Sequence, residues 1–191
     1  MISGLSRLIA IALLVLAASP SHAAEWTVEQ LMQTLRQVKQ VKARFVERKQ
    51  LAIVDKPLES SGTLVYEADA GRLEKRVLKP RAEGLLLEGD RLTFESRGQR
   101  RTMGVRDNAV VGLFVESIRS TLAGDLTTLK RLFRVTLEGS EAKWRLVLVP
   151  HEEHMRGFVS EVRLAGRRSW VDTIEFLEPQ GDHSVMSIQR D

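Results

Sequence analysis

Alternating hydrophobic and polar positions run through the chain and predict a protein built mainly from β-strands. Val41, Ala43 and Phe45 alternate with charged residues, which is the period-two pattern of a strand with one buried face. Further short runs of this kind are separated by turn residues, and Gly89-Asp90 is a compact hairpin signal. The pattern predicts eleven strands, at residues 41–45, 62–68, 73–78, 84–88, 91–96, 99–105, 135–138, 143–149, 158–164, 170–177 and 183–189.

Helical spacing interrupts the strands in two places. A capping box precedes a predicted helix at 28–39. A second helix is capped by Asp107 or Asn108 and ends at Gly124, and Asp125 caps a third. The second helix is apolar on more than one face, so it is either buried or covers an apolar space. A sheet this wide must curl or close, and we expect one mainly β (α+β) domain with its helices over one opening.

The first 23 residues have the layout of a secretory signal peptide. Arg7 gives the N-terminal segment a positive charge, and residues 8–19 form an apolar run. Ala23 ends a cleavage site of small residues. The run is shorter than the ~20 residues that span a bilayer, which favours a cleaved signal peptide. The alternative hypothesis is an uncleaved membrane anchor or a buried helix. We therefore expect cleavage near Ala23, a mature domain at 24–191 and a periplasmic location.

Composition narrows the possible functions only a little. Lys and Arg number 29 against 25 Asp and Glu, giving a formal charge of +4, with both signs interspersed. This excess fits a solvated surface, and it would also suit an acidic partner or an anionic membrane. The chain has no cysteine, so its core alone must hold an exported domain together. Export argues against nucleic-acid partners, and we expect a monomer.

The polar residues form no recognisable catalytic motif. His151 and His154 flank two glutamates, a pattern that could hold a metal on a helix, but a solvated turn is the favoured interpretation. His183 beside Asp182 is interpreted in the same way. The sequence contains no nucleophile elbow and no phosphate-binding loop. We expect no enzymatic activity, no cofactor and no metal, with a hydrolase built on these histidines as the rival hypothesis.

Several short motifs between residues 25 and 96 follow one another in an informative order. An apolar helix leads into Val41-Lys42-Ala43-Arg44-Phe45, followed by Gly62-Thr63-Leu64, a strand ending at Pro80 and the hairpin at Gly89-Asp90. After a signal peptide, this order resembles the LolA family of outer-membrane lipoprotein carriers. The resemblance implies an unclosed antiparallel β-barrel of about eleven strands, covered by a lid of about three helices.

The resemblance also implies a carrier function that uses no cofactor. Such carriers take up the acyl chains of lipoproteins from an inner-membrane release complex and pass them to an outer-membrane acceptor. By position, the cavity wall and the lid contacts would be Val41, Ala43, Phe45, Leu64, Leu73, Val77, Leu85, Leu87, Leu92, Phe94, Val111, Phe114 and Ile118. For each residue taken singly, an ordinary packed core is an equally good explanation.

Two positions depart from the family pattern. Asp69-Ala70-Gly71 stands where an Arg-Pro pair is expected, and Lys75 stands where a tryptophan is expected. The chain therefore resembles a divergent member of the family. The sequence determines neither its cargo nor the mechanism by which its lid opens. Two other hypotheses follow: a carrier of another lipid or a pigment in a dedicated biosynthetic pathway, and a periplasmic adaptor or sensor that binds a protein.

Overall fold

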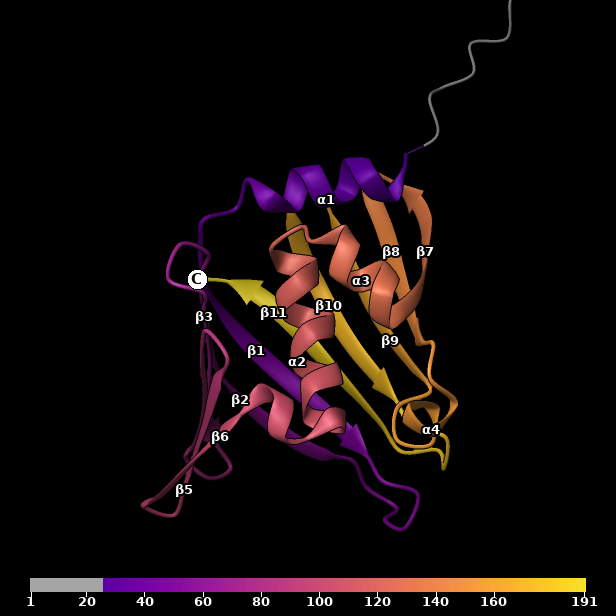
Figure 1. Cartoon of the computed structure of the whole chain (residues 1–191). Coiled ribbons are helices and arrows are strands. Elements are labelled where there is room, and N and C mark those ends of the chain that lie inside the picture. Colours follow the sequence, from indigo (N-terminus) through magenta and orange to yellow (C-terminus); the bar gives the residue numbers. More distant parts are fainter. Residues whose placement is uncertain (1–25) are drawn as a thin grey trace, which may run out of the picture.

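Eleven antiparallel strands form one curled sheet that does not close on itself (Figure 1). The computed structural model describes residues 26–191, so the predicted signal peptide at 1–23 lies outside the described residues. The strand order is β6-β5-β4-β3-β2-β1-β11-β10-β9-β8-β7, which leaves β6 and β7 as the two free edges. The predicted fold class, a mainly β unclosed barrel with a helical lid, is confirmed.

Each of the eleven predicted strands is present, with shifted boundaries. The largest shifts are at the end of β1, which continues to Gln50 instead of ending at Phe45, and at the start of β2, which begins at Leu58 instead of Gly62. Phe158 was also expected in a strand, but it is 55% exposed and precedes β9. The strands are β1 (Gln40–Gln50), β2 (Leu58–Glu67), β3 (Arg72–Lys79), β4 (Glu83–Glu88), β5 (Arg91–Ser96), β6 (Gln99–Gly104), β7 (Phe133–Ser140), β8 (Lys143–Pro150), β9 (Glu161–Arg167), β10 (Trp170–Leu177) and β11 (His183–Arg190).

In the described residues, four α-helices accompany the sheet, one more than expected. They are α1 (Val28–Arg36), α2 (Ala109–Leu122), α3 (Leu126–Leu132) and α4 (Glu153–Arg156), and the 3₁₀ turn η1 (Val105–Asp107) precedes α2. The additional helix, α4, is a single turn in the segment expected to be a loop. Among residues 26–191, no helix is both long and apolar enough to cross a membrane.

The predicted caps explain where the three longer helices begin. Thr27 and Gln30 form the expected capping box of α1. The side chain of Asn108 accepts a hydrogen bond from the amide of Val111, and that of Asp125 accepts one from Thr128. Figure 1 shows α2 and α3 in front of the concave face of the sheet and α1 across one end.

The tightly packed core lies mostly in one half of the molecule. Trp144, Leu146 and Leu164 from β8 and β9 are almost fully buried together with Leu31 and Leu35 of α1. The other half contains only a small cluster of buried residues, Leu87, Leu92 and Val105. The concave face between these two clusters is therefore the place where apolar side chains are only partly buried.

Candidate functional site

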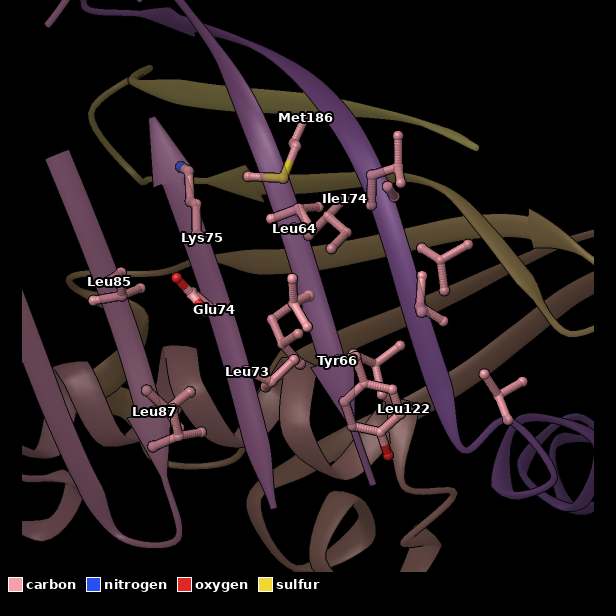
Figure 2. A pocket seen from close by; sticks show the side chains of 18 of the residues that line it. Leu64, Tyr66, Leu73, Glu74, Lys75, Leu85, Leu87, Leu122, Ile174 and Met186 are labelled. Carbon is pink, nitrogen blue, oxygen red and sulfur yellow. The ribbon is translucent and has the colours of Figure 1, made fainter. Parts of the chain in front are cut away.

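An apolar cavity of about 310 Å³ lies between α2 and the concave face of the sheet. This volume is at the lower end of the range of ~300–1,000 Å³ that is common for ligand pockets. Figure 2 shows leucines of β2, β3 and β4 together with Ile174 and Met186 around it. The lining is Leu35, Val38, Val41, Ala43, Glu47, Leu64, Val65, Tyr66, Leu73, Glu74, Lys75, Leu85, Leu87, Leu92, Phe114, Val115, Ile118, Leu122, Ser169, Trp170, Val171, Ile174, Phe176, Met186 and Ile188.

Strand alternation and register build the sheet side of the cavity. Val41 pairs with Tyr66, Tyr66 with Leu73, and Leu73 with Leu87, so four strands contribute one continuous row of side chains. The neighbouring row runs from Ala43 through Leu64 and Lys75 to Leu85. Because residues two apart point to the same face, both rows face the lid.

One face of α2 forms the lid side of the cavity. Phe114, Ile118 and Leu122 recur every four residues and therefore lie on the same side of the helix. The ring of Phe114 packs against that of Phe176 on β10, with 4.7 Å between their centroids. The same helix buries Leu113 away from this face, which accounts for the predicted apolar character on more than one side.

An ion pair interrupts the apolar lining. Lys75 Nζ lies 2.5 Å from Glu47 Oε2 and 5.0 Å from the centroid of the Phe45 ring. The other carboxylate oxygen of Glu47 accepts a hydrogen bond from Ser184 at 2.7 Å. Burial acts to raise the pKa of Glu47, but the positive charge of Lys75 and the hydrogen bonds outweigh it, so the pKa is lowered overall.

A second titratable group lies in the row of Val41. Burial, reinforced by the negative charge of Asp69, raises the pKa of the Tyr66 hydroxyl. This phenol is therefore neutral at physiological pH. Glu74 also borders the cavity, but it pairs with Arg72 and Arg76, which alternate with the inward-facing residues of β3. Its charge is thus compensated from the outer face.

Polar contacts attach the lid helices to the rest of the molecule. Arg119 of α2 donates hydrogen bonds to the carbonyl of Gly89 and to Asp90 at the tip of the β4–β5 hairpin, at 2.8 and 2.9 Å. Arg36 of α1 donates one to the carbonyl of Gly124, between α2 and α3, at 2.7 Å. Three helices and one hairpin are therefore joined by a few side-chain bonds.

Nine of the thirteen predicted site residues line the cavity. They are Val41, Ala43, Leu64, Leu73, Leu85, Leu87, Leu92, Phe114 and Ile118. Phe45 and Val77 occupy the next row of the sheet and pack in the main core. The ion pair between Lys75 and Glu47 spans this row. Val111 packs against the small cluster around Leu87, Leu92 and Val105.

Phe94 is the fourth predicted residue outside the cavity. It pairs with Leu85, so alternation places it on the concave face, but it is 39% exposed. Figure 1 shows the β5–β6 hairpin extending beyond α2. Alternation identifies the face of the sheet and says nothing about where the lid ends.

Several lining residues were not predicted. Ile174 and Phe176 of β10 and Met186 and Ile188 of β11 form the far wall. These strands come next to β1 through the long-range β1–β11 pairing, which no local pattern reveals. Glu47 could have been found, since it continues the alternation of Val41, Ala43 and Phe45.

The histidines of the rival hydrolase hypothesis are away from the cavity. His151 Nε2 lies 3.1 Å from the carbonyl of Lys130, and His154 lies 3.4 Å from Glu152 beside α4. The side chains of His154 and Glu152 are each about two-thirds exposed. In the described part of the chain, no group of three His, Asp or Glu side chains is arranged to hold a metal ion.

Comparison with known proteins shows which family the sequence matches. The family described as outer membrane lipoprotein carrier protein LolA-like matches residues 17–188. No curated protein matches the chain in sequence. Among solved structures, a LolA superfamily protein from Nitrosomonas europaea is 10% identical, with 86% of this chain and 94% of that chain covered and a TM-score of 0.43.

Two further solved structures are similar at the same low level. An outer membrane lipoprotein-sorting protein domain from Vibrio parahaemolyticus is 9% identical, with 84% of this chain and 88% of that chain covered and a TM-score of 0.47. MucB, from the Pseudomonas aeruginosa MucA/MucB complex, is 10% identical with a TM-score of 0.45. The alignment to it covers 84% of this chain but only 53% of that chain.

Proposed function

Because the chain belongs to the LolA-like family of outer membrane lipoprotein carrier proteins, we propose that it is a periplasmic lipid carrier. It binds the acyl chains of lipoproteins, or of a related lipid, and moves them from the inner to the outer membrane. The observation that carries this proposal is the apolar cavity enclosed by α2 and the concave face of the sheet. The function needs no catalytic step.

The energetics of acyl chains support a shielded cavity. Each buried CH₂ group contributes about 0.8 kcal/mol, so a chain of about ten carbons in water is disfavoured by about 8 kcal/mol. Leu64, Leu73 and Leu85 are only partly buried and would gain contacts when a chain fills the space. Incomplete burial also limits affinity, which a carrier needs in order to release its cargo.

The position of the main core supports a movable lid. The most tightly packed side chains lie between β8, β9 and α1, whereas α2 covers a partly filled space. Lid opening would therefore break the bonds of Arg119 and the apolar contacts of α2, including those of the buried Leu113, while the core between β8, β9 and α1 stays intact. Cargo that binds the open state more tightly would shift the population toward it.

The proposed partners follow from the family membership. An inner-membrane complex would deliver the lipoprotein, and an outer-membrane acceptor would receive it, with the carrier acting as a monomer. A second cargo class is supported by the Lys75–Glu47 pair, which places charged groups beside the chain-binding space. A lipid or pigment with a polar group along its chain would be compatible with such a wall, as in a dedicated biosynthetic pathway.

Filling the cavity tests the binding site. Leu64→Trp adds bulk to the cavity wall, and Thr63→Trp adds the same bulk to the opposite face of β2. We expect Leu64→Trp to weaken binding of a fluorescent fatty acid about tenfold or more and Thr63→Trp to leave it unchanged. Equal binding by the two folded variants would contradict the proposal.

Mass spectrometry of lipids extracted from the protein purified from its own periplasm identifies the cargo. A triacylated lipoprotein supports the lipoprotein carrier. A defined non-protein lipid or a polyene supports the dedicated pathway. A protein that carries no lipid and shows no saturable fatty-acid binding would instead favour the adaptor hypothesis.

A further inference from the structure

The positive charge of the chain is concentrated in one hairpin. Residues 91–106 contain five arginines and a single glutamate, Glu95. Their excess of positive charge equals the formal +4 of all 191 residues. The remaining sequence is therefore neutral on balance, and the basic excess lies in β5, β6, the turn between them and Arg106 of η1, whose last residue is Asp107.

The arginines of this hairpin lie along a free edge of the sheet. β6 pairs only with β5, and its residues 99–102 are exposed. Among the described residues, Arg97, Arg100 and Arg101 take part in no ion pair, whereas Arg106 lies 3.4 Å from Asp90. Along β6, arginine side chains without a carboxylate partner therefore lie beside backbone N–H and C=O groups that have no neighbouring strand to bond.

Both faces of this edge present an arginine. Arg101 pairs with Phe94 and shares its face of the sheet, whereas Arg100 pairs with Glu95 on the opposite face. Phe94 is 39% exposed and adds an aromatic ring beside Arg101. A strand added to β6 would alternate its side chains between the two faces and meet one guanidinium on each.

The opposite edge of the sheet has a different character. β7 carries Arg134 and Glu138, and Glu138 pairs with Arg145 of β8 at 3.6 Å. Charges that merely protect an edge from aggregation would serve both edges alike. The excess at β6 calls for a separate explanation.

We propose that the β6 edge is the docking site for an extended, acidic segment of a partner protein, which pairs with it as a twelfth strand. Backbone hydrogen bonds to the free edge would provide affinity and register, as in β-strand addition. Arginine recognises carboxylates through two parallel hydrogen bonds, which fits adjacent acidic residues whose side chains point to the two faces of the added strand. A membrane surface would engage the charges but leave the strand edge unpaired. This inference does not depend on the lipid-carrier function.

The docked segment would lie next to the start of the lid. η1 follows β6 directly and leads into α2. The amide of Val105 in η1 donates a hydrogen bond to the carbonyl of Asp90, and Asp90 also accepts one from Arg119 of α2. A partner at β6 is therefore in position to influence the lid.

The test uses the mature protein and a fluorescent octapeptide of two Glu-Glu-Val-Val repeats, in which adjacent glutamates point to opposite faces of the added strand. We expect saturable, salt-sensitive binding by fluorescence anisotropy, together with slower amide hydrogen exchange in residues 99–104. The double variant Arg100→Glu/Arg101→Glu is expected to weaken binding about tenfold or more. The matched variant Arg134→Glu on β7 is expected to bind normally.

Three controls make the result decisive. A peptide with a central proline cannot pair along the edge, so it should bind poorly; equal binding by it would overturn the proposal. Binding to vesicles containing phosphatidylglycerol that is lost in the double variant, without peptide protection of residues 99–104, would assign the edge to membranes and also overturn it. Unchanged thermal unfolding shows that the double variant is folded, so its loss of peptide binding supports the edge site.

Discussion

Lys75 and Glu47 form an ion pair on the wall of a cavity that is otherwise apolar, with 2.5 Å between Nζ and Oε2. The two side chains come from β3 and β1, and β2 lies between them. Lys75 has Leu64 and Leu85 as its register partners, so an apolar side chain would be expected at this position. The pair keeps the charge of each residue compensated where both side chains are about four-fifths buried.

Replacing one residue of the pair should lower the free energy of unfolding more than replacing both residues. Lys75→Met leaves the carboxylate of Glu47 partly buried without its cation, and we expect a loss of about 1–3 kcal/mol in the free energy of unfolding. Lys75→Met/Glu47→Met removes both charges and should recover most of this loss. Urea unfolding of the wild type, both single variants and the double variant measures the coupling. A double variant no more stable than Lys75→Met would show that the two charges do not act as a pair.

The same pair predicts a dependence of stability on pH. Glu47 has a pKa below its ordinary value of 4.5 in the folded protein. It therefore stabilises the fold above pH 4.5, and this contribution is lost as the pH falls through the lowered pKa. Glu47→Gln should be less stable than wild type at pH 7, and the difference should shrink below pH 4.5. Urea unfolding at several pH values tests this, and a constant difference would contradict it.

The strands and most of the cavity wall could be predicted because they depend on local alternation. Val41 and Ala43 show the inward face of β1 directly in the sequence, and their register partners Leu64 and Tyr66 follow from a simple meander. Most of the predicted residues on β2 to β5 belong to these rows. Their common face is a consequence of the period of the strand.

The far wall and the lid boundary depend on contacts that no local pattern encodes. Met186 and Ile188 reach the cavity because β11 pairs with β1, more than 130 residues away in sequence. Phe94 lies on the same face of the sheet as Leu87 but is 39% exposed. It belongs to the β5–β6 hairpin, which extends beyond α2 in Figure 1. The partner of Lys75 was missed because an apolar face was expected to contain apolar residues only.

Packing of α1 against the turn between α2 and α3 predicts a sensitive glycine. Gly124 has φ +65°, and a Cβ atom there would lie 2.2 Å from the carbonyl oxygen of Met32 in α1. Gly124→Ala should therefore lower the free energy of unfolding by about 2–4 kcal/mol, combining left-handed strain with overpacking. Thermal unfolding and urea titration provide the measurement.

Gly98 provides the matched control for this substitution. It has a similar φ of +73°, but a Cβ atom would meet nothing within 4 Å. Gly98→Ala should cost only the conformational part, about 1–2 kcal/mol. Equal losses in the two variants would mean that α1 yields to the added methyl group and that its contact with this turn is loose.

Arg119 and Arg106 both contact Asp90, yet only Arg119 belongs to the lid helix. Arg119 is largely buried and bonds Gly89 and Asp90, whereas Arg106 is 88% exposed. Arg119→Ala should destabilise the closed lid by about 1 kcal/mol and so raise the rate of fatty-acid entry about fivefold, whereas Arg106→Ala should leave it unchanged. Stopped-flow fluorescence gives the rates, and hydrogen exchange in α2 shows whether the lid is the element that loosens. If both variants bind at the wild-type rate, the hairpin contact does not hold the lid, and entry is controlled instead by the apolar contacts of Phe114, Ile118 and Leu122.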